Sequence, residues 1–271
     1  MSWWEAALLG LIQGLTEFLP VSSSGHLVLG QHVLGVSADA QSGVLFEALV
    51  HVGTVFSIIV IYRAELIDLF RGFFAQIIKP SDYRAAWTEV ESFRLSILIL
   101  ITMIPTGVSY LVFKDLIEAA FLDPQFTSGM LIVTGVLLIL TRLRKKPAGE
   151  ITALKAVGIG VAQSFAMLPG ISRSGATICA GIYQDVDPEK ATNFSFLMLL
   201  PVVLIGSVLQ VSEAISGGVV LVWGPMMLGM FISFVSGIVA IKMVLDFVRK
   251  GRLEYFAIYC FIIGGIGLAL L

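Results

Sequence analysis

Long apolar runs dominate the sequence and limit what it can fold into. A helix needs roughly 20 mostly apolar residues to cross the hydrocarbon core of a bilayer. Five runs qualify, at about 44–62, 93–113, 127–141, 192–212 and 220–246, and a sixth follows at about 254–271. Only 13% of the residues are charged, whereas a soluble domain carries about a quarter. We therefore expect an all-α, polytopic integral membrane protein with six full transmembrane helices, forming a single transmembrane domain over residues 1–271.

Two further apolar regions, 3–35 and 153–183, are each interrupted in the middle by Pro, Gly and Ser. Splitting each region at its break leaves arms of roughly 16 and 10 residues, or about 24 and 15 Å of helix. Because the second arm is too short to cross, each region predicts a re-entrant helical hairpin whose tip stops inside the membrane. A second full span in either region stays open as an alternative.

Basic residues predict the orientation. Lys and Arg gather in loops 63–94, 142–155 and 249–252, and are scarce in loops 114–126 and 213–219. Placing the rich loops in the cytoplasm makes every span alternate, with the first hairpin entering from outside and the second from the cytoplasm. The net charge of −2 provides no basic field, so we expect no nucleic-acid partner.

The two interrupted regions share residues at a constant offset of 150 positions. Two similar hairpins that enter from opposite faces predict an inverted-topology repeat, with halves of about 1–113 and 153–246 and the two tips near the midplane. The matched pairs are Gly10 and Gly160, Gln13 and Gln163, Ser22 and Ser172, Ser24 and Ser174, and Gly25 and Gly175.

Ionisable residues are costly inside a membrane, so each one needs an explanation. Gln13 and Glu17 stand four residues apart on one helix face, where their oxygens could hold one hard cation. The alternative is a Glu17 satisfied by neighbouring hydroxyls. On the span at 44–62, Glu47 and His51 are also four apart, and a contribution to the same cavity and an ordinary interhelical hydrogen bond are both compatible with that spacing.

The first tip places three serines before a glycine and a histidine, from Ser22 to His26. This string supplies a nucleophile, a permissive backbone turn and a proton carrier. A helix that begins here would point its positive end at the tip. The structural alternative is helix N-capping, for which serine is favoured.

The second tip contains Arg173 in the middle of an apolar hairpin. A guanidinium that is always charged requires an anion there. Ser174 could cap the following arm with Thr177 at its third position, so that hydroxyls, backbone N–H groups and the arginine form a phosphate site. An ion pair between Arg173 and Glu17 is the alternative, and both can hold in the ligand-free state.

Two strings now resemble a known family. Gln13–His26, QGLTEFLPVSSSGH, resembles the glutamate-rich signature of the bacterial undecaprenyl-diphosphate phosphatases, also called the bacitracin-resistance family, and Pro169–Thr177, PGISRSGAT, is similar to its second signature. The resemblance implies a multi-pass protein of the bacterial cytoplasmic (inner) membrane. It also implies hydrolysis of undecaprenyl diphosphate to undecaprenyl phosphate and inorganic phosphate, which recycles the lipid carrier for peptidoglycan synthesis and confers bacitracin resistance.

The resemblance also implies roles for individual residues and a divalent cation, Mg²⁺ or Ca²⁺. Gln13 stands where many members have glutamate, which weakens a site with two carboxylates, although Gln13 and Glu17 remain the expected metal ligands. Ser23 is the expected nucleophile, with Glu17 or His26 as proton acceptor, and His26 itself as the alternative nucleophile. The essential positions are matched by Glu17, Ser23, His26 and Arg173, and the expected substrate-binding residues are Ser22, Ser172, Ser174, Gly175 and Thr177.

A secondary transporter or flippase for a lipid phosphate is the main rival interpretation. Inverted repeats with broken helices at the midplane are typical of transporters. The concentration of hydroxyl, imidazole, carboxylate and guanidinium groups at one point favours an enzyme. The expected partners are the polyprenyl diphosphate substrate and membrane lipids, and the sequence leaves a homodimer open.

Overall fold

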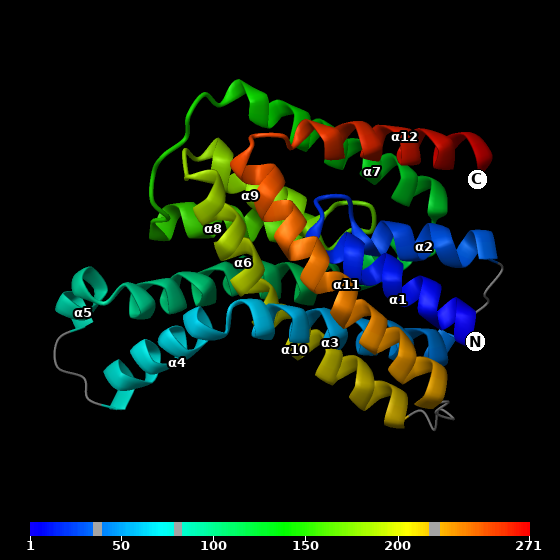
Figure 1. Ribbon diagram of the computed structural model, residues 1–271, viewed down its shortest axis with the longest axis horizontal. Coiled ribbons are helices and arrows are strands. Elements are labelled where there is room, and N and C mark those ends of the chain that lie inside the picture. The colour runs from blue at the N-terminus through cyan, green and yellow to red at the C-terminus, as the bar shows by residue number, and fades with distance from the viewer. Residues whose placement is uncertain (35–39, 79–82, 217–222) are drawn as a thin grey trace.

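The computed structural model describes residues 1–34, 40–78, 83–216 and 223–271 (Figure 1). The expected start of the span at 220–246 and part of the loop at 213–219 lie outside these ranges. Apart from one isolated bridge between Gly149 and Val186, the described chain is helical. Its helices are α1 (Trp3–Phe18), α2 (Ser23–Leu34), α3 (Ala40–Ile61), α4 (Arg63–Ile78), α5 (Tyr83–Glu89), α6 (Glu91–Ala120), α7 (Pro124–Leu140), the 3-10 helix Thr141–Leu143, α8 (Ala153–Phe165), α9 (Arg173–Tyr183), α10 (Pro188–Ser216), α11 (Trp223–Arg249) and α12 (Glu254–Leu270).

Four of the described helices, α6, α7, α10 and α11, are long and apolar enough to cross a membrane. Helices α3 and α4, which are bent by 85° at the break between them, would add a fifth span if the pair is counted as one broken span. The C-terminal helix α12 has 17 residues, which extend about 25 Å against a hydrocarbon core of about 30 Å. The all-α, multi-pass prediction is therefore confirmed, whereas the count of six full spans stays a prediction.

Both interrupted regions form pairs of short helices joined at a break. The first pair, α1 and α2, has 16 and 12 residues, and the second, α8 and α9, has 13 and 11. Each break contains the expected proline, Pro20 or Pro169, which cannot continue a helix from within. The hairpin shape predicted from the sequence is thus present in both regions.

The first arm of each hairpin packs closely against a long helix of the opposite half of the chain. Helix α1 contacts α11, and α8 contacts α6. A Cβ at Gly10 would stand 2.4 Å from the Gly229 carbonyl oxygen, and one at Gly160 would stand 2.7 Å from the Thr102 carbonyl oxygen. Glycine is required at both positions because any side chain would separate the helices. Figure 1 shows α1 beside α11, and α7 running alongside α12.

The apolar core lies between the hairpins and the long helices. Phe18, at the end of α1, packs edge to face on Phe196 of α10 with ring centroids 5.3 Å apart. Both rings are fully buried. This contact anchors the first tip to the half of the chain that carries the second tip.

Candidate active site

The two hairpin tips meet at the Glu17 carboxylate. Its Oε1 accepts a hydrogen bond from Nη2 of Arg173 at 2.5 Å, and its Oε2 accepts one from Oγ of Ser23 at 2.6 Å. The Glu17 side chain is 5% exposed and the Arg173 side chain 14% exposed. A buried ion pair of this kind costs desolvation energy, which good geometry and additional hydrogen bonds offset. The structure therefore brings Glu17, Ser23 and Arg173 together, as the sequence predicts.

Gln13 lies next to Glu17 on α1. Its Nε2 donates to Oε2 of Glu17 at 2.9 Å, while its Oε1 is buried and has no hydrogen-bond partner among the described residues. The Gln13 amide oxygen, the Glu17 carboxylate and the Ser23 hydroxyl together form a set of hard oxygen donors. Mg²⁺ and Ca²⁺ prefer ligands of this kind. With Arg173 occupying one carboxylate oxygen, such an ion would need phosphate oxygens to complete its coordination.

Glu17 accepts a hydrogen bond from only one of the two terminal nitrogens of the Arg173 guanidinium. Its Nη1 is buried and makes no hydrogen bond within the described chain. An unpaired buried guanidinium nitrogen is costly unless it finds an acceptor. The free donor fits an anionic ligand at the second tip, such as a phosphate oxygen.

The His26 imidazole is hydrogen-bonded to a backbone carbonyl and to a tyrosine. Its Nδ1 is 2.7 Å from the Ser22 carbonyl oxygen, which makes it the protonated nitrogen, and its Nε2 is 2.8 Å from the Tyr259 hydroxyl. The imidazole and the phenol ring are nearly parallel, with centroids 5.5 Å apart. Both ring nitrogens of His26 are therefore occupied, and the Tyr259 hydroxyl fixes the orientation of the imidazole.

The hydroxyls of the second tip are occupied within the protein. Ser172 caps α9 by accepting a hydrogen bond from the Gly175 N–H at 3.1 Å. Ser174 donates to the Leu19 carbonyl of the first tip at 3.2 Å, and the Thr177 hydroxyl is 2.6 Å from that of Ser195. All three hydroxyl side chains are at most 1% exposed. Contact of these groups with a phosphate stays a prediction.

Capping by Ser174 is wrong, because helix α9 begins at Arg173, two residues earlier than the Gly175 start that this cap would give. Arg173 is its first residue, so Ser172 holds the N-cap and Thr177 lies beyond the third position. The backbone explains the shift: Ser172 has the extended conformation of a cap (φ −68°, ψ 119°). The guanidinium thereby starts from the first turn of the helix, beside the free N–H groups.

The first tip repeats this capping pattern. The Gly25 N–H donates to Oγ of Ser22 at 3.2 Å, and the hydroxyls of Ser22 and Ser24 are 3.3 Å apart. The hydroxyls of Ser172 and Ser174 are 3.2 Å apart in the second tip. One difference is that Ser22 has φ +69°, a left-handed conformation that costs a side-chain-bearing residue roughly 1–2 kcal/mol.

Two residues near the site, His51 and Tyr259, were not among the site residues expected from the sequence. His51 has Nε2 at 3.7 Å from Oε2 of Glu17 and Nδ1 at 2.7 Å from the Glu47 carbonyl oxygen. The Glu47 side chain instead accepts from Gln31 at 3.0 Å. The spacing of Glu47 and His51 was the available signal for His51, whereas Tyr259 had none, since it comes from α12.

The chain is similar to known proteins along its whole length. Residues 6–266 match the model of the family described as bacitracin resistance protein BacA. The chain is 54% identical, over the whole length of both proteins, to an undecaprenyl-diphosphatase of Salinibacter ruber. It is 41% and 39% identical to undecaprenyl-diphosphatases of Bacteroides fragilis and Desulfatibacillum aliphaticivorans, with 97% of this chain and 96% and 97% of theirs covered. This full-length similarity shows that the chain belongs to the bacitracin resistance protein BacA family.

Proposed function

We propose that this chain is an undecaprenyl-diphosphatase in which the two hairpin tips form one active site. It hydrolyses undecaprenyl diphosphate to undecaprenyl phosphate and inorganic phosphate in the bacterial inner membrane, and so returns the lipid carrier to peptidoglycan synthesis. The observation that carries the proposal is the convergence of the Ser23 hydroxyl and the Arg173 guanidinium on the two oxygens of Glu17.

Ser23 is the proposed nucleophile. Glu17, whose Oε2 lies 2.6 Å from the Ser23 hydroxyl, accepts its proton. The Oγ–P bond forms as the bond from the terminal phosphorus to the bridging oxygen breaks, and undecaprenyl phosphate leaves. Water then cleaves the phosphoserine and releases inorganic phosphate. His26 lies on the same tip and supplies or removes protons in these steps.

Arg173 stabilises the charge of the transferring phosphoryl group. Its Nη1 has no partner within the described chain, so it can bind a phosphate oxygen while Nη2 stays on Glu17. Fixed donors in a buried site that excludes water contribute more than the same donors would in water. A divalent cation would be held by oxygens of Gln13, Glu17 and Ser23, and would supply further positive charge against the phosphates.

We also propose that the chain is an inverted repeat with six full spans. The support is a swapped packing pattern: α1 packs on α11, while α8, its counterpart, packs on α6. The helices that follow the two halves, α7 and α12, pack against each other. A pseudo-twofold axis in the membrane plane would exchange α1 with α8, α11 with α6, and α7 with α12.

Phosphate release from undecaprenyl diphosphate by the purified full chain tests the function. The assay compares samples with and without EDTA, and compares Arg173→Ala with Arg144→Ala, an exposed arginine of the loop after α7. We expect release that requires the cation, is lost in Arg173→Ala and is retained in Arg144→Ala. Absence of release from folded protein would contradict the proposal, and transport of lipid phosphate across vesicles would then be measured.

A further inference from the structure

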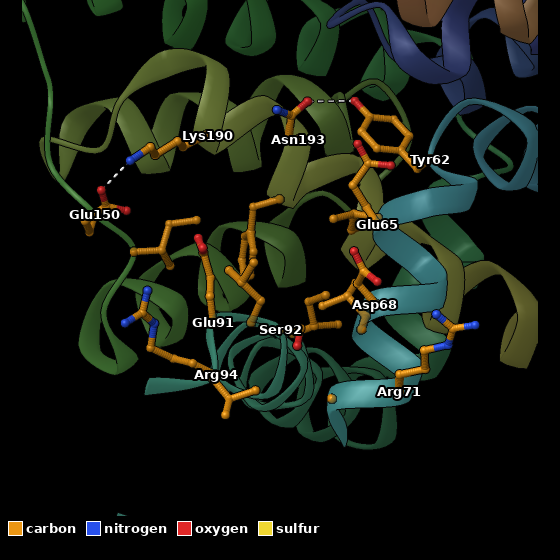
Figure 2. A pocket seen from close by; sticks show the side chains of 18 of the residues that line it. Tyr62, Glu65, Asp68, Arg71, Glu91, Ser92, Arg94, Glu150, Lys190 and Asn193 are labelled. Atoms are coloured by element: carbon orange, nitrogen blue, oxygen red, sulfur yellow. Dashed lines mark hydrogen bonds and ion pairs between the residues drawn. The ribbon is translucent and has the colours of Figure 1, made fainter. Parts of the chain in front are cut away.

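A cavity of about 720 Å³ lies apart from the hairpin tips (Figure 2). Its walls come from α4, the start of α6, the segment before α8 and the start of α10, and none of the tip residues lines it. These walls belong to the segments around the basic loops 63–94 and 142–155, which the charge pattern places on the cytoplasmic side. The cavity is therefore a separate feature at the cytoplasmic end of the bundle.

The lining of the cavity carries charged side chains of both signs. Figure 2 shows Glu65 and Asp68 reaching in from α4, with Glu91 and Arg94 on the opposite side. Glu150 forms an ion pair with Lys190. Among the described residues, the carboxylates of Glu65, Asp68 and Glu91 form no ion pair and accept no side-chain hydrogen bond. A ligand with a cationic group and an anionic group would satisfy both kinds of side chain.

The inner wall of the cavity is apolar and continues into a second groove. Leu69, Ile99 and Leu197 line both the cavity and an adjoining groove of about 200 Å³. Along α6 and α10 the lining changes from charged residues at the helix starts to apolar residues further along each helix. The remaining apolar residues of the groove are Leu66, Phe70, Phe73, Leu100, Leu200 and Pro201.

Helix α4 places this combined groove at the membrane surface. It bends by 85° from α3, so if α3 crosses the bilayer, α4 lies close to the membrane plane. Its Phe70 and Ile78 are exposed, at 61% and 73%, while Glu65 and Asp68 line the cavity. An amphipathic helix with this distribution is typical of the boundary between headgroups and acyl chains.

We propose that the groove binds one phospholipid with an ammonium–phosphate headgroup, of the phosphatidylethanolamine class. The ammonium donates to Glu65 and Asp68, the phosphate binds Arg94, and an acyl chain follows the apolar wall past Leu69 and Leu197. A purely anionic headgroup would meet the unpaired carboxylates of the lining. A trimethylammonium headgroup cannot donate the hydrogen bonds that these carboxylates accept.

Native mass spectrometry of the purified full chain tests the headgroup site. The protein is incubated with equal amounts of phosphatidylethanolamine, phosphatidylcholine and phosphatidylglycerol, and the retained lipid is counted. We expect one phosphatidylethanolamine, retained about tenfold less by Glu65→Gln/Asp68→Asn, because charge-assisted hydrogen bonds are lost. The control, Asp115→Asn/Glu118→Gln, removes two carboxylates from the other end of α6 and should bind as the wild type does.

A second arm tests the acyl-chain groove. Leu100→Trp fills the groove and should lower retention of every lipid, whereas Leu111→Trp, on the same helix and 81% exposed outside the groove, should not. Equal retention of phosphatidylglycerol, unchanged binding by the double variant, or retention of no lipid by folded wild type would each overturn the proposal. A melting temperature for every variant separates loss of binding from loss of folding.

Discussion

The two hairpin tips share one pattern of serine capping, which we call the frame. They differ in the side chain that the first residue of the following helix presents. In both tips a serine accepts a hydrogen bond from the glycine N–H three residues later, and a second serine lies beside it. Ser23 and Arg173 occupy equivalent positions, because each is the first residue of the helix that follows its tip. One presents a hydroxyl and the other a guanidinium, and both bind Glu17.

Neither hairpin carries the full set of reactive side chains found at the site. The position equivalent to Glu17 in the second hairpin is Met167, and the position equivalent to His26 is Ala176. The first hairpin therefore carries the Ser23 hydroxyl, the carboxylate and the imidazole, and the second carries the fixed positive charge. The common frame positions these groups, and the side chain at one position decides the chemistry of each tip.

Exchanging Ser23 for alanine should have the largest effect. If Ser23 is the attacking group, Ser23→Ala lowers phosphate release on the order of 10⁴-fold, because loss of a nucleophile removes a whole catalytic unit. Ser24→Ala, one residue away, removes only the contact with the Ser22 hydroxyl and should keep activity within about threefold of wild type. Retained activity in Ser23→Ala would remove this serine from the attacking role.

Breaking the ion pair between the tips tests their mutual dependence through stability. Glu17→Gln should lower the free energy of unfolding by about 3 kcal/mol, because it leaves the buried Arg173 charge unpaired. Adding Arg173→Met should recover at least half of that loss. Unfolding in mixed detergent micelles measures both changes.

The control for this experiment is Glu189→Gln, which breaks an exposed ion pair with Arg249 and should cost less than about 1 kcal/mol. A cost for Glu17→Gln as small as that of the control would mean that the two tips do not depend on this ion pair.

Glycine substitution at the two capping serines should change the free energy of unfolding differently, although the two frames are otherwise similar. Ser22→Gly removes the left-handed strain at φ +69° and loses only a few tenths of a kcal/mol of capping, so it should be neutral or stabilising by about 0.5 kcal/mol. Ser172→Gly gains no such relief, since its φ is −68°, and should destabilise by about 0.5 kcal/mol. Equal changes in the free energy of unfolding would show that the frames are the same in backbone strain as well.

The smallest expected effect on activity concerns His26, which has no equivalent in the second tip. Tyr259→Phe removes the hydroxyl that lies 2.8 Å from Nε2 of His26 and should lower phosphate release about threefold, the factor for a modest hydrogen bond. Tyr255→Phe, on the same helix, should leave activity unchanged. Equal activity of both variants would show that the Tyr259 hydroxyl does not orient the imidazole.

The parts of the site that came from local patterns were predictable. The breaks in the two hairpins follow from proline and glycine in short arms, and the matched positions at an offset of 150 indicate that the tips are related. The ion pair between Glu17 and Arg173 could be weighed in advance, because charges buried in a membrane need partners. Each of these inferences rests on residues close in the chain or on the cost of burying a charge.

Other features depended on the tertiary structure. His26 and Tyr259 are 233 positions apart, and His51 reaches Glu17 only because α3 lies against α1. The start of α9 at Arg173 depends on which serine caps the helix. The sequence offers both Ser172 and Ser174, and the structure uses Ser172. The mixed-charge cavity beside α4 requires the 85° bend after α3.

The sequence by itself determined that the chain is a multi-pass membrane protein, that two of its apolar regions break into hairpins, and which reactive side chains the two tips carry. The tertiary structure decided which of these side chains touch and which neighbours orient them. The physical reason is that hydropathy, helix breaking and charge burial act on short stretches of chain. The contacts of His26, His51 and the cavity, by contrast, arise from packing between helices whose order in the sequence does not specify their distances.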